Sequence, residues 1–320
     1  MADAPPPLAQ PHPSRLRRWL LSPDGRLRAG WRLLLHGLLL ISLWMALLIP
    51  AIVIIVISEG ASSLTTLDSP ALLLASSTAM TIGTFAATWL ARRLFDRRSL
   101  SSLGLTFDAH TFPDLLAGMA IAFSMMGTVF LIQLAAGWLT LEGWGWQQLS
   151  WQGTLINLLL SLVLYILVGF QEELLFRGYQ LQNLVEGWSL PWALLTSSVL
   201  FALAHLSNPS ANWNAFLGIA LAGMLLALAW LRTRSLWLPI GLHIGWNFFE
   251  GTVFGFPVSG LGGFHLVRHR VDGPLLITGG AFGPEAGAVL LPGLILAAWI
   301  IVRCTRRRPP SLPPDASRSI

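Results

Sequence analysis

Long apolar runs, separated by short polar stretches, dominate the pattern of this chain. A run such as 155–170 is nearly continuous and rich in Leu, whereas a membrane β-strand shows about ten residues of alternating polarity. A helix needs roughly 20 apolar residues to cross a bilayer. The pattern therefore predicts an all-α, polytopic membrane helix bundle around a polar cavity. We expect about eight transmembrane helices, near residues 33–57, 71–91, 115–139, 152–171, 191–206, 214–231, 236–256 and 286–302.

Composition supports the membrane class. Hydrophobic residues make up 54% of the 320 residues and charged residues only 11%, against roughly 25% charged residues in a soluble domain. The formal charge is +5, and all 20 basic residues are Arg. These arginines cluster at the ends of the apolar runs, which favours contact with lipid headgroups over nucleic acid as the partner.

Arginine also follows an alternating pattern between the predicted spans. Because cytoplasmic loops carry the excess of basic residues, the pattern predicts a multi-pass protein of the cell membrane with both termini on the cytoplasmic side. The exception is the 257–285 loop, which is expected outside yet holds Arg268 and Arg270. Arginine-bearing segments are 92–98, 232–235 and 303–308, and arginine-free loops are 59–70, 140–151 and 207–213.

Three regions follow from these boundaries. Residues 1–30 are Pro-rich and then basic, and we expect a disordered tail with a basic juxtamembrane segment. Residues 31–303 are expected to form the transmembrane domain, and residues 304–320 a disordered basic tail. The single cysteine, Cys304, forms no internal disulfide and no Cys-based metal site.

Ionisable residues inside a membrane cost about 2.5–3.5 kcal/mol each on insertion scales, so they are candidate functional residues. The first group is Glu172, Glu173 and Arg177, at the end of the fourth predicted span. Glu173 and Arg177 are four residues apart on one helix face and are expected to pair. Glu172 is rotated by about 100° from Glu173 and points elsewhere. The alternative is an interfacial ion pair with no further role.

The second and third groups are histidines with regular spacing. His205 follows Phe201 by four residues at the end of the fifth span, and His243 precedes Asn247 by four in the seventh. A single histidine or asparagine in an apolar helix is more often a packing residue. Their occurrence on separate spans, in a chain that otherwise avoids such residues, indicates a shared site. One difficulty is depth: Glu172 is predicted near the cytoplasmic end of its span and His205 near the outer end of its own.

Hydrolysis is the chemistry that this set allows. A Glu can take a proton from water, while His and Asn donate hydrogen bonds to an oxyanion. Alternatively, Glu172, His205 and His243 could hold a divalent metal such as zinc with a position open for water. The common zinc-protease pattern HExxH is absent. Both readings, with and without a metal cofactor, stay open at this stage.

The three motifs together resemble the CAAX protease and bacteriocin-processing family, which includes the type II CAAX prenyl endopeptidases. The family pattern is EExxxR, FxxxH and HxxxN, and the resemblance covers about residues 150–250. It implies that Glu172 is the general base, assisted by His205. Glu173 and Arg177 would structure the site, and His243 with Asn247 would bind the oxyanion.

The expected function is therefore an intramembrane endopeptidase that cleaves near the cytoplasmic membrane interface. Its substrate would be a peptide or protein, and the family name suggests a prenylated C-terminal tail. Two alternatives remain: a non-catalytic immunity or scaffold protein of the same family, and a transporter with a proton-relay site. A transporter is disfavoured because the polar residues occupy only one half of the chain.

Overall fold

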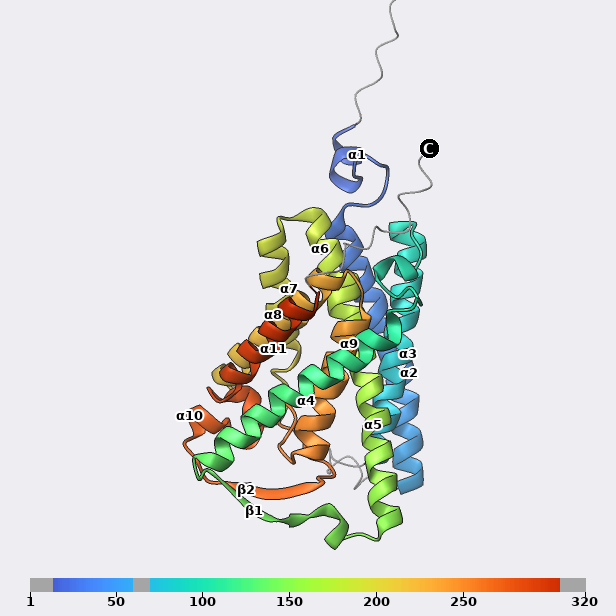
Figure 1. Ribbon diagram of the computed structural model, residues 1–320. Helices are drawn as coiled ribbons and strands as arrows, with labels where there is room; N and C mark the ends of the chain where they lie inside the picture. The colour runs from blue at the N-terminus through green and yellow to red at the C-terminus, as the bar shows by residue number, and fades with distance from the viewer. Residues whose placement is uncertain (1–13, 60–69, 306–320) are drawn as a thin grey trace, which may run out of the picture.

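The computed structural model describes residues 14–59 and 70–305, and shows a helix bundle with a small two-stranded antiparallel sheet (Figure 1). The predicted all-α membrane bundle is confirmed. The helices are α1 (Arg15–Leu20), α2 (Ala29–Glu59), α3 (Pro70–Ala91), α4 (Thr111–Ala135), α5 (Trp151–Glu173), α6 (Leu181–Gly187), α7 (Leu190–Ala204), α8 (Trp213–Thr233), α9 (Trp237–Asn247), α10 (Leu275–Thr278) and α11 (Leu290–Thr305). Short π-helices are η2 (Arg92–Asp96), η5 (Leu174–Gln180) and η6 (Phe248–Val253), 3-10 turns are η3 (Ser101–Leu103), η4 (Gly145–Gln147), η7 (Gly280–Phe282) and η8 (Pro284–Ala286), and the strands are β1 (Leu139–Trp144) and β2 (Val267–Val271).

Each of the eight predicted spans falls on a helix. Within residues 14–59 and 70–305, five helical segments are long and apolar enough to cross a membrane, and they begin at residues 29, 70, 111, 151 and 213. Helices α7 and α11 are shorter but apolar. On α2, large side chains such as Leu34, Leu38 and Ile41 are exposed, as expected for a surface in contact with lipid. The protein is thus a multi-pass membrane protein, while the count of eight spans stays a prediction.

The fourth span is longer than the predicted range 152–171. Helix α5 continues through η5 into α6 as one segment, Trp151–Gly187, of 37 residues. Hydropathy ends the span too early because it counts Glu173 and Arg177 as polar. In the fold these two side chains pair with each other and are buried inside the bundle.

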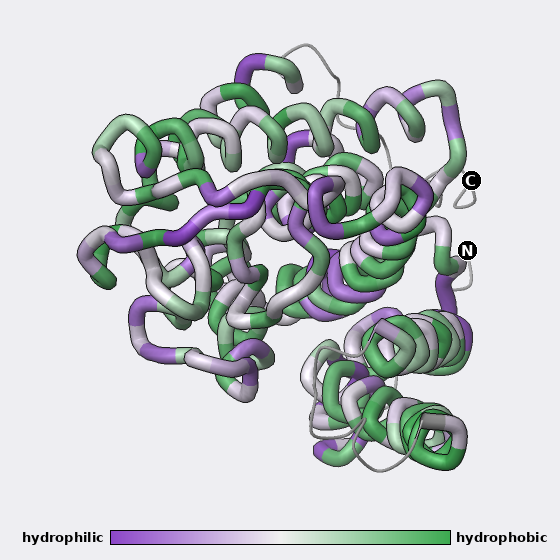
Figure 2. The backbone as a smooth tube through the Cα atoms, turned by 90° about the horizontal axis from the view of Figure 1, so that it is seen from below, coloured by the Kyte–Doolittle hydropathy of each residue, from purple (hydrophilic) through white to green (hydrophobic). Residues whose placement is uncertain are grey.

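The segments predicted as the loops 140–151 and 257–285 contribute two strands that form a small antiparallel sheet, which the sequence pattern missed. Strand β1 pairs with β2 from Leu139 opposite Val271 to Trp144 opposite Val267, with a register shift between Leu141 and Gly143. The two strands cross the end of the bundle remote from α1, where Figure 2 shows a hydrophilic band. They lie outside the candidate spans, and β2 carries Arg268 and Arg270.

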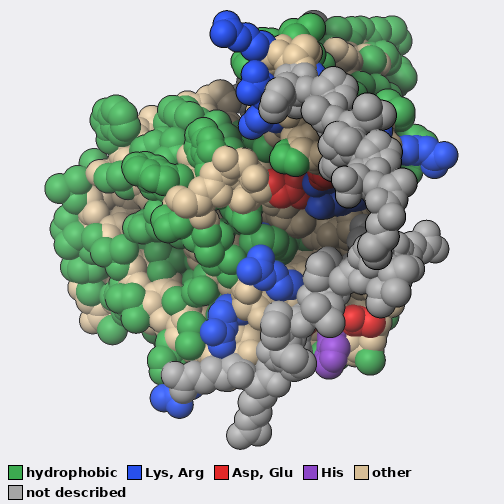
Figure 3. Space-filling model, turned by 90° about the horizontal axis from the view of Figure 1, so that it is seen from above, with side chains coloured by type: hydrophobic (Ala, Val, Ile, Leu, Met, Phe, Trp, Pro, Cys, Tyr) green, Lys and Arg blue, Asp and Glu red, His purple; other side chains and the backbone are tan. Residues whose placement is uncertain are grey.

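The described parts of the other arginine-bearing segments, 92–98, 232–235 and 303–305, gather at the opposite end together with α1 (Figures 1 and 3). Asp96 bridges Arg32 and Arg92 at 3.0 and 2.8 Å, which ties α2 to η2. Arg232 donates to the Thr305 hydroxyl at 2.8 Å, which ties α8 to α11. The common end for these segments agrees with the predicted alternation, whereas its assignment to the cytoplasm stays a prediction.

The expected tails lie largely outside the described residues, which exclude 1–13 and 306–320. Within the expected basic juxtamembrane segment, Arg15–Leu20 form helix α1, with the Ser14 hydroxyl accepting from the Arg17 backbone N–H. A capped turn of helix rich in Arg and Leu suits a membrane interface better than a solvated tail.

Helix α9 lies at the centre of the bundle, and all of its residues are buried. Glycines allow this close packing. A Cβ at Gly241 would lie 2.2 Å from the Leu115 carbonyl oxygen of α4, and one at Gly169 of α5 would lie 2.9 Å from the Ile244 side chain. Small residues at helix contacts are the usual means of close approach in membranes. The packing fixes α9, and with it His243, between α4 and α5.

Candidate active site

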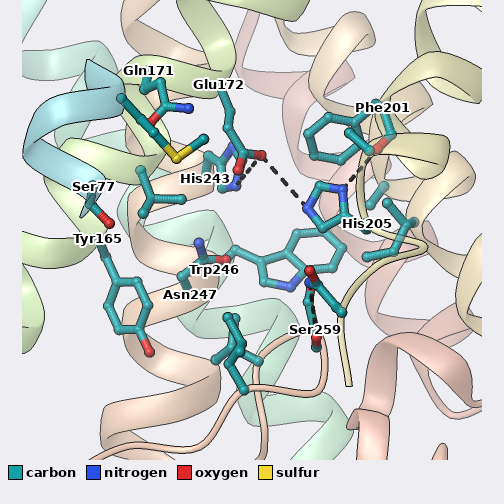
Figure 4. A pocket seen from close by; sticks show the side chains of 18 of the residues that line it. Ser77, Tyr165, Gln171, Glu172, Phe201, His205, His243, Trp246, Asn247 and Ser259 are labelled. Carbon is teal, nitrogen blue, oxygen red and sulfur yellow. Dashed lines mark hydrogen bonds and ion pairs between the residues drawn. The ribbon is translucent and has the colours of Figure 1, made fainter. Parts of the chain in front are cut away.

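Glu172, His205 and His243 converge on one point inside the bundle (Figure 4). Glu172 Oε2 lies 3.7 Å from His205 Nε2 and 3.8 Å from His243 Nε2. The depth difficulty disappears because α5 and η5 form one long segment, which places Glu172 in its interior rather than at its end. The local π-helix η5 begins two residues later; such bulges are frequent at functional sites.

Hydrogen bonds fix the orientation of both imidazoles. His205 Nδ1 lies 2.8 Å from the Phe201 carbonyl oxygen, and His243 Nδ1 lies 2.8 Å from Glu173 Oε1. A carbonyl and a carboxylate only accept, so both Nδ1 atoms carry the proton. Both Nε2 atoms therefore face Glu172. In the FxxxH motif, the imidazole of His205 is thus held by the backbone carbonyl of Phe201.

Glu173 joins two of the predicted motifs. Its Oε1 accepts from Arg177 Nη1 at 2.8 Å, the expected ion pair, and also from His243. Arg177 Nη2 donates to the Gly223 carbonyl of α8 at 3.1 Å, and its guanidinium lies 4.2 Å from the centre of the Phe201 ring. The contact with His243 was not predicted, because the sequence does not say which helices face each other.

Asn247 lies one turn beyond His243 on α9 and lines the same cavity. Its amide forms no hydrogen bond with the described part of the chain, and Figure 4 shows it beside the cavity. A free amide on the wall is suited to binding a carbonyl group of a substrate. All six predicted site residues are therefore brought together: Glu172, Glu173, Arg177, His205, His243 and Asn247.

The cavity has a volume of about 390 Å³ and includes residues that the sequence did not indicate. Tyr165 of α5, and Ser259 and Glu285 of the 257–285 segment, form part of its wall. Glu285 Oε2 accepts from both the backbone N–H and the hydroxyl of Ser259 at 2.6 Å. Part of the 257–285 segment, which was expected to be an outside loop, thus folds into the site. A lone glutamate in a loop carried no signal that could have indicated this.

The lining of the cavity bears on the expected cleavage near the cytoplasmic membrane interface. Beyond the site, its wall includes Ser207 and Asn208 of the loop between α7 and α8, and Leu261 and Gly262 of the segment that leads to β2. Strand β2 lies at the end of the bundle remote from α1 (Figure 1). An opening on the side of α1 therefore gains no support from these lining residues.

The three converging side chains were also candidates for a zinc site. Ligand atoms about 2.0–2.2 Å from one tetrahedral zinc lie about 3.3–3.6 Å apart, closer than the 3.7 and 3.8 Å separations here. Within residues 14–59 and 70–305, no group of three or more His, Cys, Asp or Glu side chains is arranged to hold a metal ion. The arrangement as it stands does not fit zinc.

Comparison with known proteins gives one match. Residues 154–249 match the family model described as Type II CAAX prenyl endopeptidase Rce1-like. No curated protein and no solved structure matches the chain. The matched range contains the six site residues and runs from α5 to the end of α9, whereas Glu285 and helices α2 to α4 lie outside it. The match over residues 154–249 confirms the resemblance to the type II CAAX prenyl endopeptidases that was seen in the sequence.

Proposed function

We propose that this protein is an intramembrane endopeptidase in which Glu172 activates a water molecule. The observation that carries the proposal is the convergence of Glu172 Oε2 with the Nε2 atoms of His205 and His243. At 3.7–3.8 Å the three groups are too far apart for direct hydrogen bonds, and such a separation suits a bridging water. Glu172 Oε2 is buried and has no hydrogen-bond partner among the described residues, so it is free to accept from that water.

Each step of the hydrolysis has a suitable group. Water attacks the peptide carbonyl carbon while Glu172 takes its proton. The C–N bond then breaks, and Glu172, assisted by His205, returns the proton to the departing amine. Asn247 donates to the oxyanion. A doubly protonated His243 can also donate, because the negative charges of Glu173 and of the oxyanion would together balance the positive charges of Arg177 and His243.

The mechanism that we propose needs no metal, and the substrate is a peptide or protein. The Rce1-like match supports a CAAX-type protease, and on that basis a prenylated C-terminal tail is the first substrate class to test. We further propose that both termini lie on the cytoplasmic side of the cell membrane. The clustering of arginines at that end supports this orientation.

Cleavage of quenched fluorogenic peptides, both CAAX-type and generic, by the purified protein tests the proposal. We expect Glu172→Gln and His243→Ala each to lower the rate at least about a hundredfold, as for loss of a general base or an oxyanion donor. Glu142→Gln is the matched control, since Glu142 is exposed on β1 and remote from the site. Its rate should equal that of the wild type.

A chelator arm separates the two mechanisms. We expect full activity after treatment with a zinc chelator. Loss of activity on chelation, with recovery on adding zinc, would replace the metal-free mechanism by the zinc one. Unchanged activity in Glu172→Gln would refute the site, and wild type that cleaves no peptide would favour the scaffold alternative.

A further inference from the structure

A second cavity lies at the end of the bundle that carries α1, far from the active site. It has a volume of about 650 Å³ and lies between α1, the start of α2 and the end of α6. Its wall combines the basic residues Arg18 and Arg28 with Trp19, Trp31 and Trp188. Of these five residues only Trp188 lies within the matched family segment, and it is not one of the six site residues, so the proposed function does not account for this groove.

The two arginines of the groove keep an uncompensated charge. Arg28 Nε donates to the Arg18 carbonyl at 2.8 Å, which holds the two residues side by side. In the described part of the chain neither guanidinium forms an ion pair. The nearby carboxylates are taken by other arginines: Asp24 by Arg26, Asp96 by Arg32 and Arg92, and Glu186 by Arg26, Arg32 and Arg98.

The start of α2 adds backbone donors to the same groove. This helix has 31 residues, and its first turn, with Ala29 and Gly30, lies in the groove wall. Gly30 is exposed and a Cβ there would meet nothing within 4 Å, so the groove is open at this turn of the helix. Unpaired arginines beside the N-terminus of a long helix favour a phosphate group.

The aromatic residues indicate where that phosphate comes from. Trp19 packs edge-to-face on Trp31 with ring centres 4.6 Å apart, and Trp19 and Trp188 are 60% and 56% exposed. Tryptophan collects at the headgroup level of membranes. Below the groove, α2 presents exposed apolar side chains such as Leu34 and Leu38, along which acyl chains can lie.

We infer that this groove binds the headgroup of an anionic phospholipid. Arg18 and Arg28 hold the phosphate, the first turn of α2 contributes N–H groups, and the three tryptophans enclose the glycerol region. The acyl chains continue along α2. The site anchors α1 against α2 and α6 in the leaflet on the side of α1.

The test is lipid binding to the full-length protein, measured by native mass spectrometry with phosphatidylglycerol, phosphatidylcholine and free glycerol phosphate. We expect tight binding of phosphatidylglycerol only. The double variant Arg18→Gln/Arg28→Gln should weaken it about twentyfold, from roughly fivefold per arginine at an anionic surface. The matched control is Arg15→Gln/Arg17→Gln, which removes the same charge from α1 at positions outside the groove wall.

Three results would overturn the inference. Equal weakening by the two double variants would mean general attraction to a charged helix. Equal binding of phosphatidylcholine would remove the role of charge, and binding of glycerol phosphate as tight as that of the lipid would make the ligand a soluble anion.

Discussion

Glu172 and Glu173 are adjacent in the chain but make different contacts. Glu173 is fully buried and holds both Arg177 and His243, whereas Glu172 is 19% exposed and has no bond shorter than 3.7 Å to either histidine. Removal of one member of a buried ion pair leaves an unpaired charge and costs about 3–5 kcal/mol. The two carboxylates should therefore respond differently to the same substitution.

We expect Glu173→Gln to lower the free energy of unfolding by about 3 kcal/mol, because Arg177 stays buried without its partner. Glu172→Gln should change stability by less than about 0.5 kcal/mol while abolishing cleavage. Thermal unfolding of both variants in detergent, followed by tryptophan fluorescence, is the measurement. Similar midpoints for the two variants would contradict the division of roles.

Many of the individual site residues could be predicted from the sequence. The spacing of Glu173 and Arg177 predicts their ion pair because a helix sets the geometry of residues four apart. The contact between Glu173 and His243 could not be predicted, because it depends on α5 and α9 lying side by side. Glu285 was not predicted as a site residue for a similar reason. The path of a loop brings it to the cavity, and no periodic sequence pattern describes that path.

At the element scale, α9 holds its position through contacts that leave no room for a side chain. We expect Gly241→Ala to push α9 away from Leu115 of α4, since the added Cβ would lie 2.2 Å from a carbonyl oxygen. Overpacking of this kind costs about 1–3 kcal/mol. His243 lies two residues further on, so cleavage should fall together with the unfolding midpoint.

Gly37→Ala is the matched control for this substitution. Gly37 lies inside α2, and a Cβ there meets nothing within 4 Å. Alanine favours a helix more than glycine does, so this variant should be as stable as the wild type or slightly more stable, with full activity. A Gly241→Ala variant that behaves like the control would show that α4 and α9 can separate without cost.

The helices themselves were predictable from apolar runs, and the exceptions have physical causes. The fourth span continues past its apolar run because its polar side chains pair inside the bundle. The sheet of β1 and β2 was missed because both strands are short and they lie far apart in sequence. Pairing between distant segments is a property of the whole fold.

In the molecule as a whole, strand β1 and the 257–285 segment, which contains β2, cover one end of the bundle, and the 257–285 segment supplies part of the cavity wall. Two histidines attach this cover to the end of η6. His265 Nδ1 lies 2.9 Å from the Gly251 carbonyl oxygen, and His269 Nε2 lies 2.8 Å from that of Phe254. His269 also packs on Phe130 and Phe256. The cover is therefore held in part by two imidazole side chains.

Burial lowers the pKa of His269 below its usual 6.5. The hydrogen bond to the Phe254 carbonyl opposes this effect without cancelling it, the nearby His265 lowers the pKa further, and Glu142 raises it slightly. The attached strand β2 therefore favours neutral His269, while a released strand binds the proton more readily. Because the released state takes up more protons, the attachment is at full strength above about pH 6.5 and weakens as the pH falls toward the lowered pKa.

We expect amide hydrogen exchange in Val267–Val271, corrected for the intrinsic pH dependence, to be faster at pH 5.5 than at pH 7.5. His269→Gln keeps a side-chain donor but does not titrate, so its corrected exchange should be the same at both pH values. A pH dependence that persists in this variant would assign the effect to another group, with His265 the next to replace.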